Sequence, residues 1–326
     1  MPAQPSPISA QVGNFGGPIE PVAAPGFGER LAARVRERQS QIVLGLDPDP
    51  MALWPGLDVP AAGSPAQRAA AAVAAHCRAL IDSAGLACVA AKPQLARFEA
   101  LGAPGWEALQ TVVEHARSAG LLVIADCKRG DIDVSARAYA TALMGTLDTP
   151  FGPVEGLGVD MATVNPLMGS DAITPFLQTA RTSAAAVLLL VRTSNPGAAD
   201  VEDLKLASGE LVWERIAMLA EELGRPHVDG SGFSDVGAVV GATVPAHLRR
   251  ARELMPSAVF LLPGVGAQGG RVEDLAPAFA PGRCGGLIAA SRSIANAYLQ
   301  AGGEAADAAR AESERLRELA WRISTG

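Results

Sequence analysis

The chain has 326 residues, a length that fits either two average domains or one large barrel, and 49% of them are apolar, enough for a sizeable core. The formal net charge of −7 argues against a nucleic-acid-binding protein, and no apolar run reaches the length of a membrane span. An anionic ligand would therefore have to be held by a local group of cations.

The N-terminus is rich in proline and glycine and lacks the basic and apolar regions of a signal peptide. We expect residues 1–28 to form a loosely ordered arm before a catalytic domain over residues 29–326. The four cysteines form no CxxC pair, and the four histidines lack the spacing of metal ligands. The sequence therefore predicts a cytoplasmic protein with reduced thiols and no metal site.

Short apolar runs alternate with Ala-rich amphipathic segments along the whole chain. The runs are nearly continuous in hydrophobicity, as in parallel strands that are covered on both faces. The predicted strands are Ile42–Leu46, Ala87–Ala91, Leu121–Ala125, Gly158–Val164, Ala186–Val191, Val236–Val240, Val259–Leu262 and Gly286–Ala290.

Helix start and stop signals lie between these strands. The predicted helices run from Ser64 to about Ala84, from Pro104 to Gly120, from Ser208 to Gly224, from Pro245 to Pro256 and from Glu304 to Ile323. Residues 226–235 read as a surface loop. The alternation without a break in composition predicts a single (β/α)8 TIM barrel with an N-terminal arm and a C-terminal helix.

Charged side chains gather where the predicted third strand ends. Residues two apart in an extended strand point the same way, roughly 7 Å from each other, so Asp126 and Lys128 should face the barrel mouth and Cys127 the helix layer. Lys92 closes the neighbouring strand, and Asp131 lies on the following turn. A solvated ion-pair cluster is the plain alternative, and such clusters stabilise little. Because only three of the 27 basic residues are lysines, the pattern favours a functional amine.

The segment DCKRGDI, residues 126–132, resembles the D-x-K-x-x-D-I motif of the orotidine 5′-phosphate decarboxylase family. The segments LGLDPDP, KPQ, RTSNPG, VVGAT, PGVGAQGG and SRSI follow that family's order, in its bacterial type 2 subgroup, over roughly residues 28 to 300. The resemblance implies decarboxylation of orotidine 5′-monophosphate (OMP) to uridine 5′-monophosphate (UMP) in pyrimidine biosynthesis, with no metal or organic cofactor. It also implies a homodimer.

The family's charged tetrad corresponds to Lys92, Asp126, Lys128 and Asp131. The resemblance implies that Lys128 donates a proton to C6 of the pyrimidine and that Asp126 lies near the substrate carboxylate. It implies that Lys92 and Asp131 keep Lys128 protonated and aimed, with Asp131 entering the partner subunit's site.

The remaining family positions imply the substrate contacts. Asp47 corresponds to a ribose ligand, Ile132 and Ser135 to the edge of the pocket that the partner supplies, Ser194 to the group that binds the pyrimidine amide edge, Pro263 to the base pocket, and Gln268, Ser291 and Arg292 to the phosphate site. The loop over residues 196–208 would close on the phosphate. By the residues alone, a turn before Asn195-Pro196 is the favoured role of Ser194, and Arg292 could be a surface cation at a helix start.

Three other functions remain open from the residues. A literal G-x-G-x-x-G at residues 264–269 could indicate a dinucleotide-binding oxidoreductase, but it follows the seventh strand and no carboxylate comes about 20 residues later. Another barrel enzyme, such as a sugar-phosphate decarboxylase or aldolase, would use a metal or a Schiff base on Lys92 or Lys128. A pyrimidine-nucleotide-binding protein without catalysis is the third.

Overall fold

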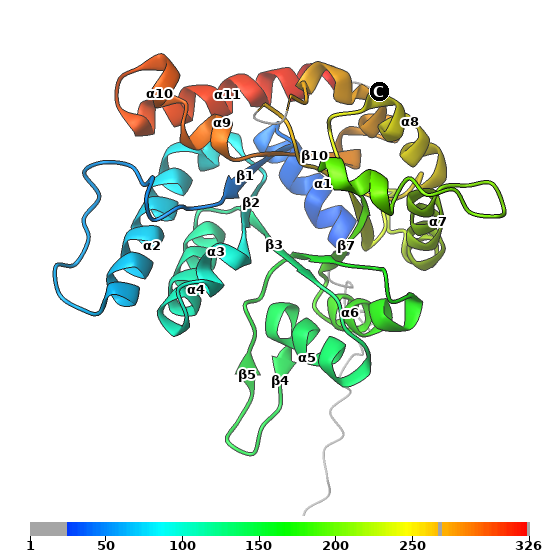
Figure 1. Cartoon of the computed structure of the whole chain (residues 1–326), viewed down its shortest axis with the longest axis horizontal. Helices are drawn as coiled ribbons and strands as arrows, with labels where there is room; N and C mark the ends of the chain where they lie inside the picture. The colour runs from blue at the N-terminus through cyan, green and yellow to red at the C-terminus, as the bar shows by residue number, and fades with distance from the viewer. Residues whose placement is uncertain (1–24, 267–268, 325–326) are drawn as a thin grey trace, which may run out of the picture.

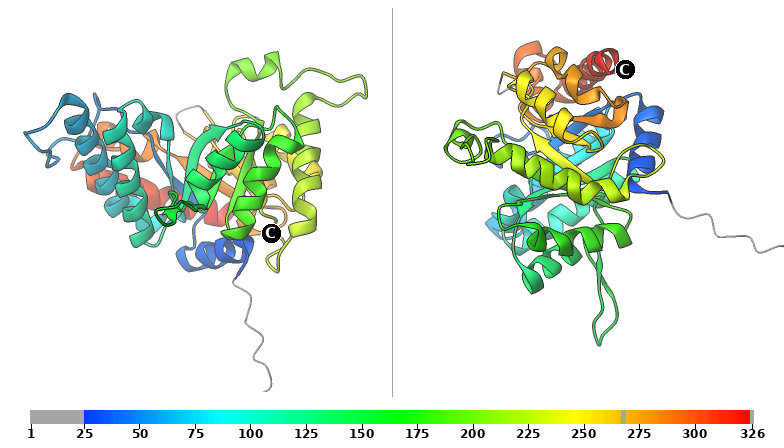
Figure 2. Two further views of the ribbon diagram at one scale, coloured as in Figure 1. Left: turned by 90° about the horizontal axis from the view of Figure 1, so that it is seen from below. Right: turned by 90° about the vertical axis from the view of Figure 1, so that its right-hand side faces the viewer.

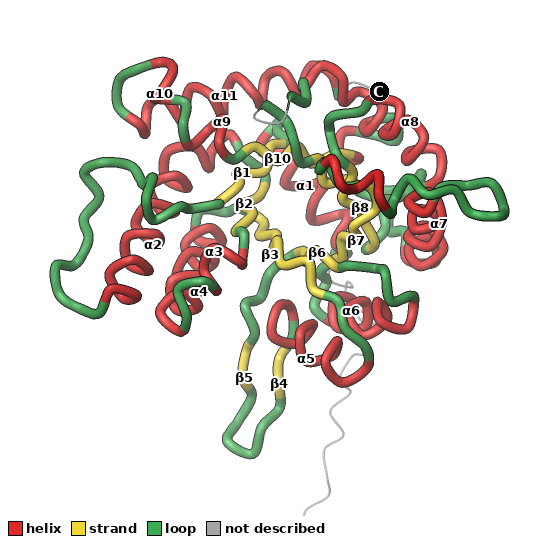
Figure 3. The backbone as a smooth tube through the Cα atoms, viewed as in Figure 1, coloured by secondary structure: helices red, strands yellow, loops and turns green. Residues whose placement is uncertain are grey.

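The structure, a computed structural model, describes residues 25–266 and 269–324. Eight parallel strands close into a barrel in the order β1-β10-β9-β8-β7-β6-β3-β2 (Figures 1 and 3). The barrel strands are β1 (Ile42–Leu46), β2 (Ala90–Pro93), β3 (Leu122–Arg129), β6 (Met161–Val164), β7 (Ala186–Arg192), β8 (Val236–Val240), β9 (Phe260–Leu262) and β10 (Gly286–Ala290). The predicted (β/α)8 barrel is confirmed, and each predicted strand overlaps an observed one.

All the helices but α1 lie around the strands as an outer layer among the described residues (Figure 3). They are α1 (Phe27–Arg38), α2 (Pro65–Ala84), α3 (Leu95–Glu99), α4 (Ala103–Ser118), α5 (Asp133–Met144), α6 (Ser170–Thr182), α7 (Val212–Gly224), α8 (Pro245–Leu254), α9 (Arg292–Ala295), α10 (Tyr298–Ala301) and α11 (Ala305–Ile323). Ser64 and Gln67 form a reciprocal capping box at the start of α2. Helix α7 begins later than the predicted Ser208, because the Glu214 carboxylate caps the backbone N–H of Leu211.

The apolar residues form two cores on opposite sides of the sheet. One core fills the barrel with side chains such as Val43, Ile124 and Leu261. The other packs between the strands and the helix layer. Both faces of the strands are therefore buried, which explains their nearly continuous apolar sequence.

Helix α1 closes the floor of the barrel, at the amino ends of the strands. Its residues Phe27, Leu31 and Val35 belong to the interior core, although Phe27 lies within the predicted arm. The predicted surface loop 226–235 holds this helix: the Asp229 carboxylate accepts the N–H of Glu29 at 3.0 Å, and Phe233, in the same loop, is buried in the interior core. The part of the predicted arm in residues 1–24 lies outside the described residues.

A small antiparallel hairpin lies outside the barrel, formed by β4 (Thr146–Leu147) and β5 (Val154–Glu155). It projects from the helix layer beside α5 (Figure 2). The sequence did not predict it, because two residue pairs of strand are too short for a periodic signal. Among the described residues, no helix is long and apolar enough to cross a bilayer.

Candidate active site

Five side chains at the carboxyl ends of barrel strands, four of them polar, face the same side as the interior core. Alternate residues of a strand face the same side. Residues two or four places beyond Val43, Ala90, Ile124, Leu261 and Ala289 of the interior core therefore reach the barrel mouth. These residues are Asp47, Lys92, Asp126, Pro263 and Ser291.

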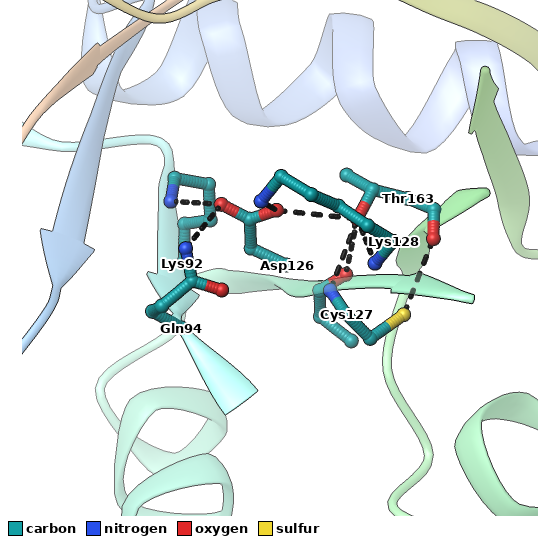
Figure 4. Close-up of polar contacts among 7 residues, drawn as sticks. Lys92, Gln94, Asp126, Cys127, Lys128 and Thr163 are labelled. Carbon is teal, nitrogen blue, oxygen red and sulfur yellow. Dashed lines mark hydrogen bonds and ion pairs between the residues drawn. The ribbon is translucent and has the colours of Figure 1, made fainter. Parts of the chain in front are cut away.

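A chain of opposite charges lies at the centre of this mouth (Figure 4). The Lys92 ammonium donates to Asp126 Oδ2 at 2.7 Å, and the Lys128 ammonium donates to Asp126 Oδ1 at 2.5 Å. Lys92 and Asp126 are only 5% and 8% exposed, whereas the side chain of Lys128 is 45% exposed. The buried Lys92–Asp126 pair therefore holds the Lys128 amine, which is accessible to a ligand in the barrel mouth.

The buried pair stays ionised because each partner compensates the other's desolvation. Burial by itself would lower the pKa of Lys92, but the carboxylates of Asp126 and Asp47 outweigh it and raise that pKa above the ordinary value. Burial by itself would raise the pKa of Asp126, but the Lys92 and Lys128 ammoniums outweigh it and lower that pKa. At neutral pH Lys92 and Asp126 therefore form a buried ion pair.

Asp126 and Lys128 meet as the sequence predicts, but regular strand alternation is not the reason. Strand β3 loses its register with β6 between Ala125 and Arg129, and Lys128 has a φ of 46°. Such left-handed backbone costs a non-glycine residue about 1–3 kcal/mol, and it persists where the surroundings impose it. Cys127 packs against the helix-side core, as expected.

The charge chain lines a cavity of about 650 Å³ at the mouth. The predicted site residues that line it are Asp47, Lys92, Asp126, Lys128, Ser194, Pro263, Ser291 and Arg292. The sequence did not single out Gln94, Arg97, Thr193 or Asn195, which also line it. Gln94, Thr193 and Asn195 could have been found from their position directly after the β2 and β7 strands, whereas Arg97 lies on the following helix α3 and gave no such signal.

Three predicted residues lie outside this cavity. Ile132 and Ser135 are exposed and Asp131 is half-buried, at the start of α5. Asp131 Oδ1 accepts the N–H of Ile132 at 2.8 Å. Within the described ranges, no hydrogen bond or ion pair joins Asp131 to Lys92 or Lys128. The chain therefore brings together three members of the predicted tetrad, Lys92, Asp126 and Lys128. Gln268 lies outside the described residues.

One carboxylate oxygen in the cavity lacks a partner. Asp47 Oδ1 is buried and accepts no hydrogen bond from the part of the chain that the structure describes. Since buried polar atoms are nearly always hydrogen-bonded, this oxygen is suited to accept a donor from a ligand.

Two glycines let neighbouring loops approach the strands closely. A Cβ on Gly45 would lie 1.7 Å from Ser291 Oγ and 2.7 Å from its Cβ. A Cβ on Gly241 would lie 3.0 Å from the Cβ of Ser194. The bare backbone of β1 and of the residue after β8 therefore determines where Ser291 and Ser194 can sit.

The segment after β7 is tied back onto the strand end. The Arg192 guanidinium donates to both oxygens of Asp203 at 2.9 Å, a two-point contact. The Glu202 carboxylate accepts from the backbone N–H and the hydroxyl of Thr193, each at 2.9 Å. These contacts close the loop that carries Ser194 and that projects from the barrel between β7 and α7 (Figure 1).

The sequence profile of the orotidine 5′-phosphate decarboxylase / HUMPS family matches residues 40–308. The chain belongs to this family. It is 39% identical over 274 residues to the orotidine 5′-phosphate decarboxylase of Rhodopirellula baltica, covering 83% of this chain and 89% of the relative. It is 40% identical over 293 residues to that of Deinococcus radiodurans, covering 90% and 97%.

A solved structure agrees with this assignment to the orotidine 5′-phosphate decarboxylase family. The OMP decarboxylase of Leishmania donovani superposes with a TM-score of 0.68 at 31% identity, covering 92% of this chain and 98% of that one. The predicted family is confirmed, and the narrower type 2 subgroup stays a prediction. Among the described residues, no group of three or more His, Cys, Asp or Glu side chains could hold a metal ion.

Proposed function

We propose that this chain decarboxylates OMP to UMP, a step of pyrimidine biosynthesis. The observation that carries the proposal is the row of alternating charges Lys92–Asp126–Lys128 at the mouth of the barrel. Relatives of this protein are named for the same reaction. The amine that reaches the cavity lies 2.5 Å from a carboxylate that is itself held by a second amine. Such an arrangement holds a positive charge in place before the reaction begins.

Lys128 is the proton donor in this proposal. When the bond between C6 and the carboxyl group breaks, its electron pair stays on C6, where the pyrimidine ring offers little resonance stabilisation. An ammonium beside C6 stabilises the developing negative charge and then transfers its proton to that carbon. Solvent returns a proton to the neutral amine after UMP and CO2 leave.

Asp126 and Lys92 keep that ammonium in place. Asp126 would lie near the substrate carboxylate, and the repulsion between the two groups would be relieved as CO2 leaves. Lys92 is buried behind Asp126 and keeps it ionised.

The other cavity residues are proposed to hold the nucleotide. The unpartnered Asp47 Oδ1 would accept a ribose hydroxyl. Ser194 would contact the amide edge of the pyrimidine, and Pro263 would border the base. Arg292 and Ser291 would bind the phosphate together with Gln268, which lies outside the described residues. The planar fork of arginine suits a phosphate.

We propose further that the protein is a homodimer in which Asp131, Ile132 and Ser135 contribute to the partner's site. Their position outside their own cavity is compatible with that role. A largely apolar groove of about 530 Å³ runs beside them between α4, α5 and the hairpin, and Trp106, Val134 and Leu147 line it. Apolar surface of this kind is typical of protein interfaces.

Hybrid dimers test the shared site. Lys128→Ala and Asp131→Asn are each expected to be inactive. When the two variants are unfolded together and refolded, random pairing in a symmetric dimer should restore about a quarter of the sites, because half of the dimers then hold one intact site. If Asp131 acts within its own subunit, the mixture stays inactive.

The activity itself is tested by OMP turnover, followed by ultraviolet absorbance and by CO2 release. The parent protein should turn over OMP in the presence of a chelator. Lys128→Ala should lose turnover but keep part of its UMP binding. Arg310→Ala, on the exposed side of α11, is the matched control. Comparable turnover by Lys128→Ala and the parent would rule out the proton donor, and no turnover by the folded parent would refute the function.

A further inference from the structure

A buried threonine on the strand next to β3 contacts every part of the β3 bulge (Figure 4). Thr163 lies on β6 and is fully buried. Its Oγ1 accepts the N–H of Cys127 at 3.0 Å and the N–H of Lys128 at 2.9 Å. The same hydroxyl donates to Asp126 Oδ1 at 3.2 Å. One donor and two acceptor positions are all that a hydroxyl offers, so this hydroxyl is fully used.

These contacts replace the strand pairing that the bulge removes. Ala125 pairs with Ala162, and the next pair is Arg129 with Val164. Strand β3 thus advances four residues while β6 advances two. The N–H groups of Cys127 and Lys128 no longer meet a strand carbonyl, and buried N–H groups need an acceptor. The Thr163 hydroxyl is that acceptor.

The threonine is also held from the other side. Cys127 Sγ donates to the backbone carbonyl of Thr163 at 3.2 Å. The Thr163 side chain therefore bonds the backbone of the bulge, and the Cys127 side chain bonds the backbone of Thr163. Among the described residues, the Thr163 hydroxyl is the one group that bonds both the Asp126 carboxylate and the backbone N–H of Lys128.

We propose that Thr163 is a positioning residue, whose hydroxyl sets the left-handed backbone of Lys128 and so aims the proton-donating amine at the reacting carbon. The inference rests on the proposed function. Thr163 does not line the cavity, so it acts through Lys128 and Asp126 rather than on the nucleotide. The proposed phosphate, ribose and base contacts come from the segments after β1, β7, β9 and β10. Loss of the hydroxyl should therefore change turnover much more than nucleotide binding.

Crossed substitutions separate this role from packing. Thr163→Val keeps the shape and the methyl group but removes the hydroxyl, whereas Thr163→Ser keeps the hydroxyl and removes the methyl group. We expect kcat of Thr163→Val to fall on the order of a hundredfold, the effect of a misplacement of about 1 Å. Its KM for OMP and its Kd for UMP should stay within about threefold of the parent, and Thr163→Ser should recover most of kcat.

Thr179→Val is the control, because it removes a threonine hydroxyl that bonds within α6 and away from the cavity. If Thr163→Val does not fold, kcat of Thr163→Ser is compared with kcat of Thr163→Ala, since these two variants differ only in the hydroxyl oxygen. A kcat of Thr163→Ser that is tens of times higher than that of Thr163→Ala supports the proposal. A ratio near one overturns it. So does a folded Thr163→Val with kcat near the parent's, or a Thr163→Ser as slow as Thr163→Val. A parent protein without turnover would instead refute the proposed function.

Discussion

Acidification should loosen the long connection after β1 through a single buried histidine. His76 lies on α2 and is 5% exposed, and its Nδ1 accepts the N–H of Trp54 at 3.2 Å. The Trp54 indole donates in turn to the Ala295 carbonyl on α9, at 2.8 Å. Burial lowers the pKa of His76 from 6.5 to about 4. A proton on Nδ1 would also leave the Trp54 N–H facing another donor.

The sign and size of the effect follow from that pKa. The unfolded chain binds a proton at His76 near pH 6.5 and the folded chain only near pH 4, so the stability from neutral His76 is complete above pH 6.5 and lost as the pH falls. The full difference corresponds to about 3 kcal/mol, of which about 2.5 kcal/mol is lost by pH 4.5.

Urea denaturation at several pH values between 7.5 and 4.5 measures this loss, with His76→Asn as the reference. The asparagine carbonyl can accept the Trp54 N–H but does not titrate in this range. Carboxylates contribute the same slope to both proteins, so the difference between the two stability curves isolates His76. Stability curves of the parent and His76→Asn that run parallel down to pH 4.5 would refute the reasoning.

Two substitutions test how the structure holds its loops. Gly45→Ala places a Cβ 2.7 Å from the Cβ of Ser291 and so displaces Ser291 from the cavity wall. It should raise KM for OMP by roughly tenfold or more, since substrate binding depends on where the contacting side chains lie. Gly85→Ala is the control, because its Cβ would meet Leu121 Cδ1 at an ordinary 3.4 Å, and it should leave KM unchanged. Arg252 is 7% exposed, and its guanidinium donates to the carbonyls of Met255, Pro256, Ala258, Ala278 and Gly285. Arg252→Met removes these five hydrogen bonds. It should lower the free energy of unfolding in urea by about 3–5 kcal/mol, whereas a loss below about 1 kcal/mol, as expected for the exposed Arg310→Met, would contradict that count.

The sequence alone determined the strands of the barrel and most of the cavity. The apolar runs specify β1, β8 and β10 to the residue, because continuous hydrophobicity over four to eight residues is a local property of a strand buried on both faces. The charges directly after the runs reach the mouth because all parallel strands end on the same side. Lys92, Asp126 and Lys128 could therefore be found together from the residues in the motif.

Tertiary structure decided what local periodicity does not encode. The φ of Lys128 depends on a register break with β6 and on the hydroxyl of Thr163, and no pattern within 123–133 shows either. Helix α1 and Phe233 of loop 226–235 close the barrel floor because they meet there in space, although about 200 residues separate them in the chain. The position of Asp131 outside its own cavity likewise follows from the path of the chain after β3, which sequence spacing alone cannot specify.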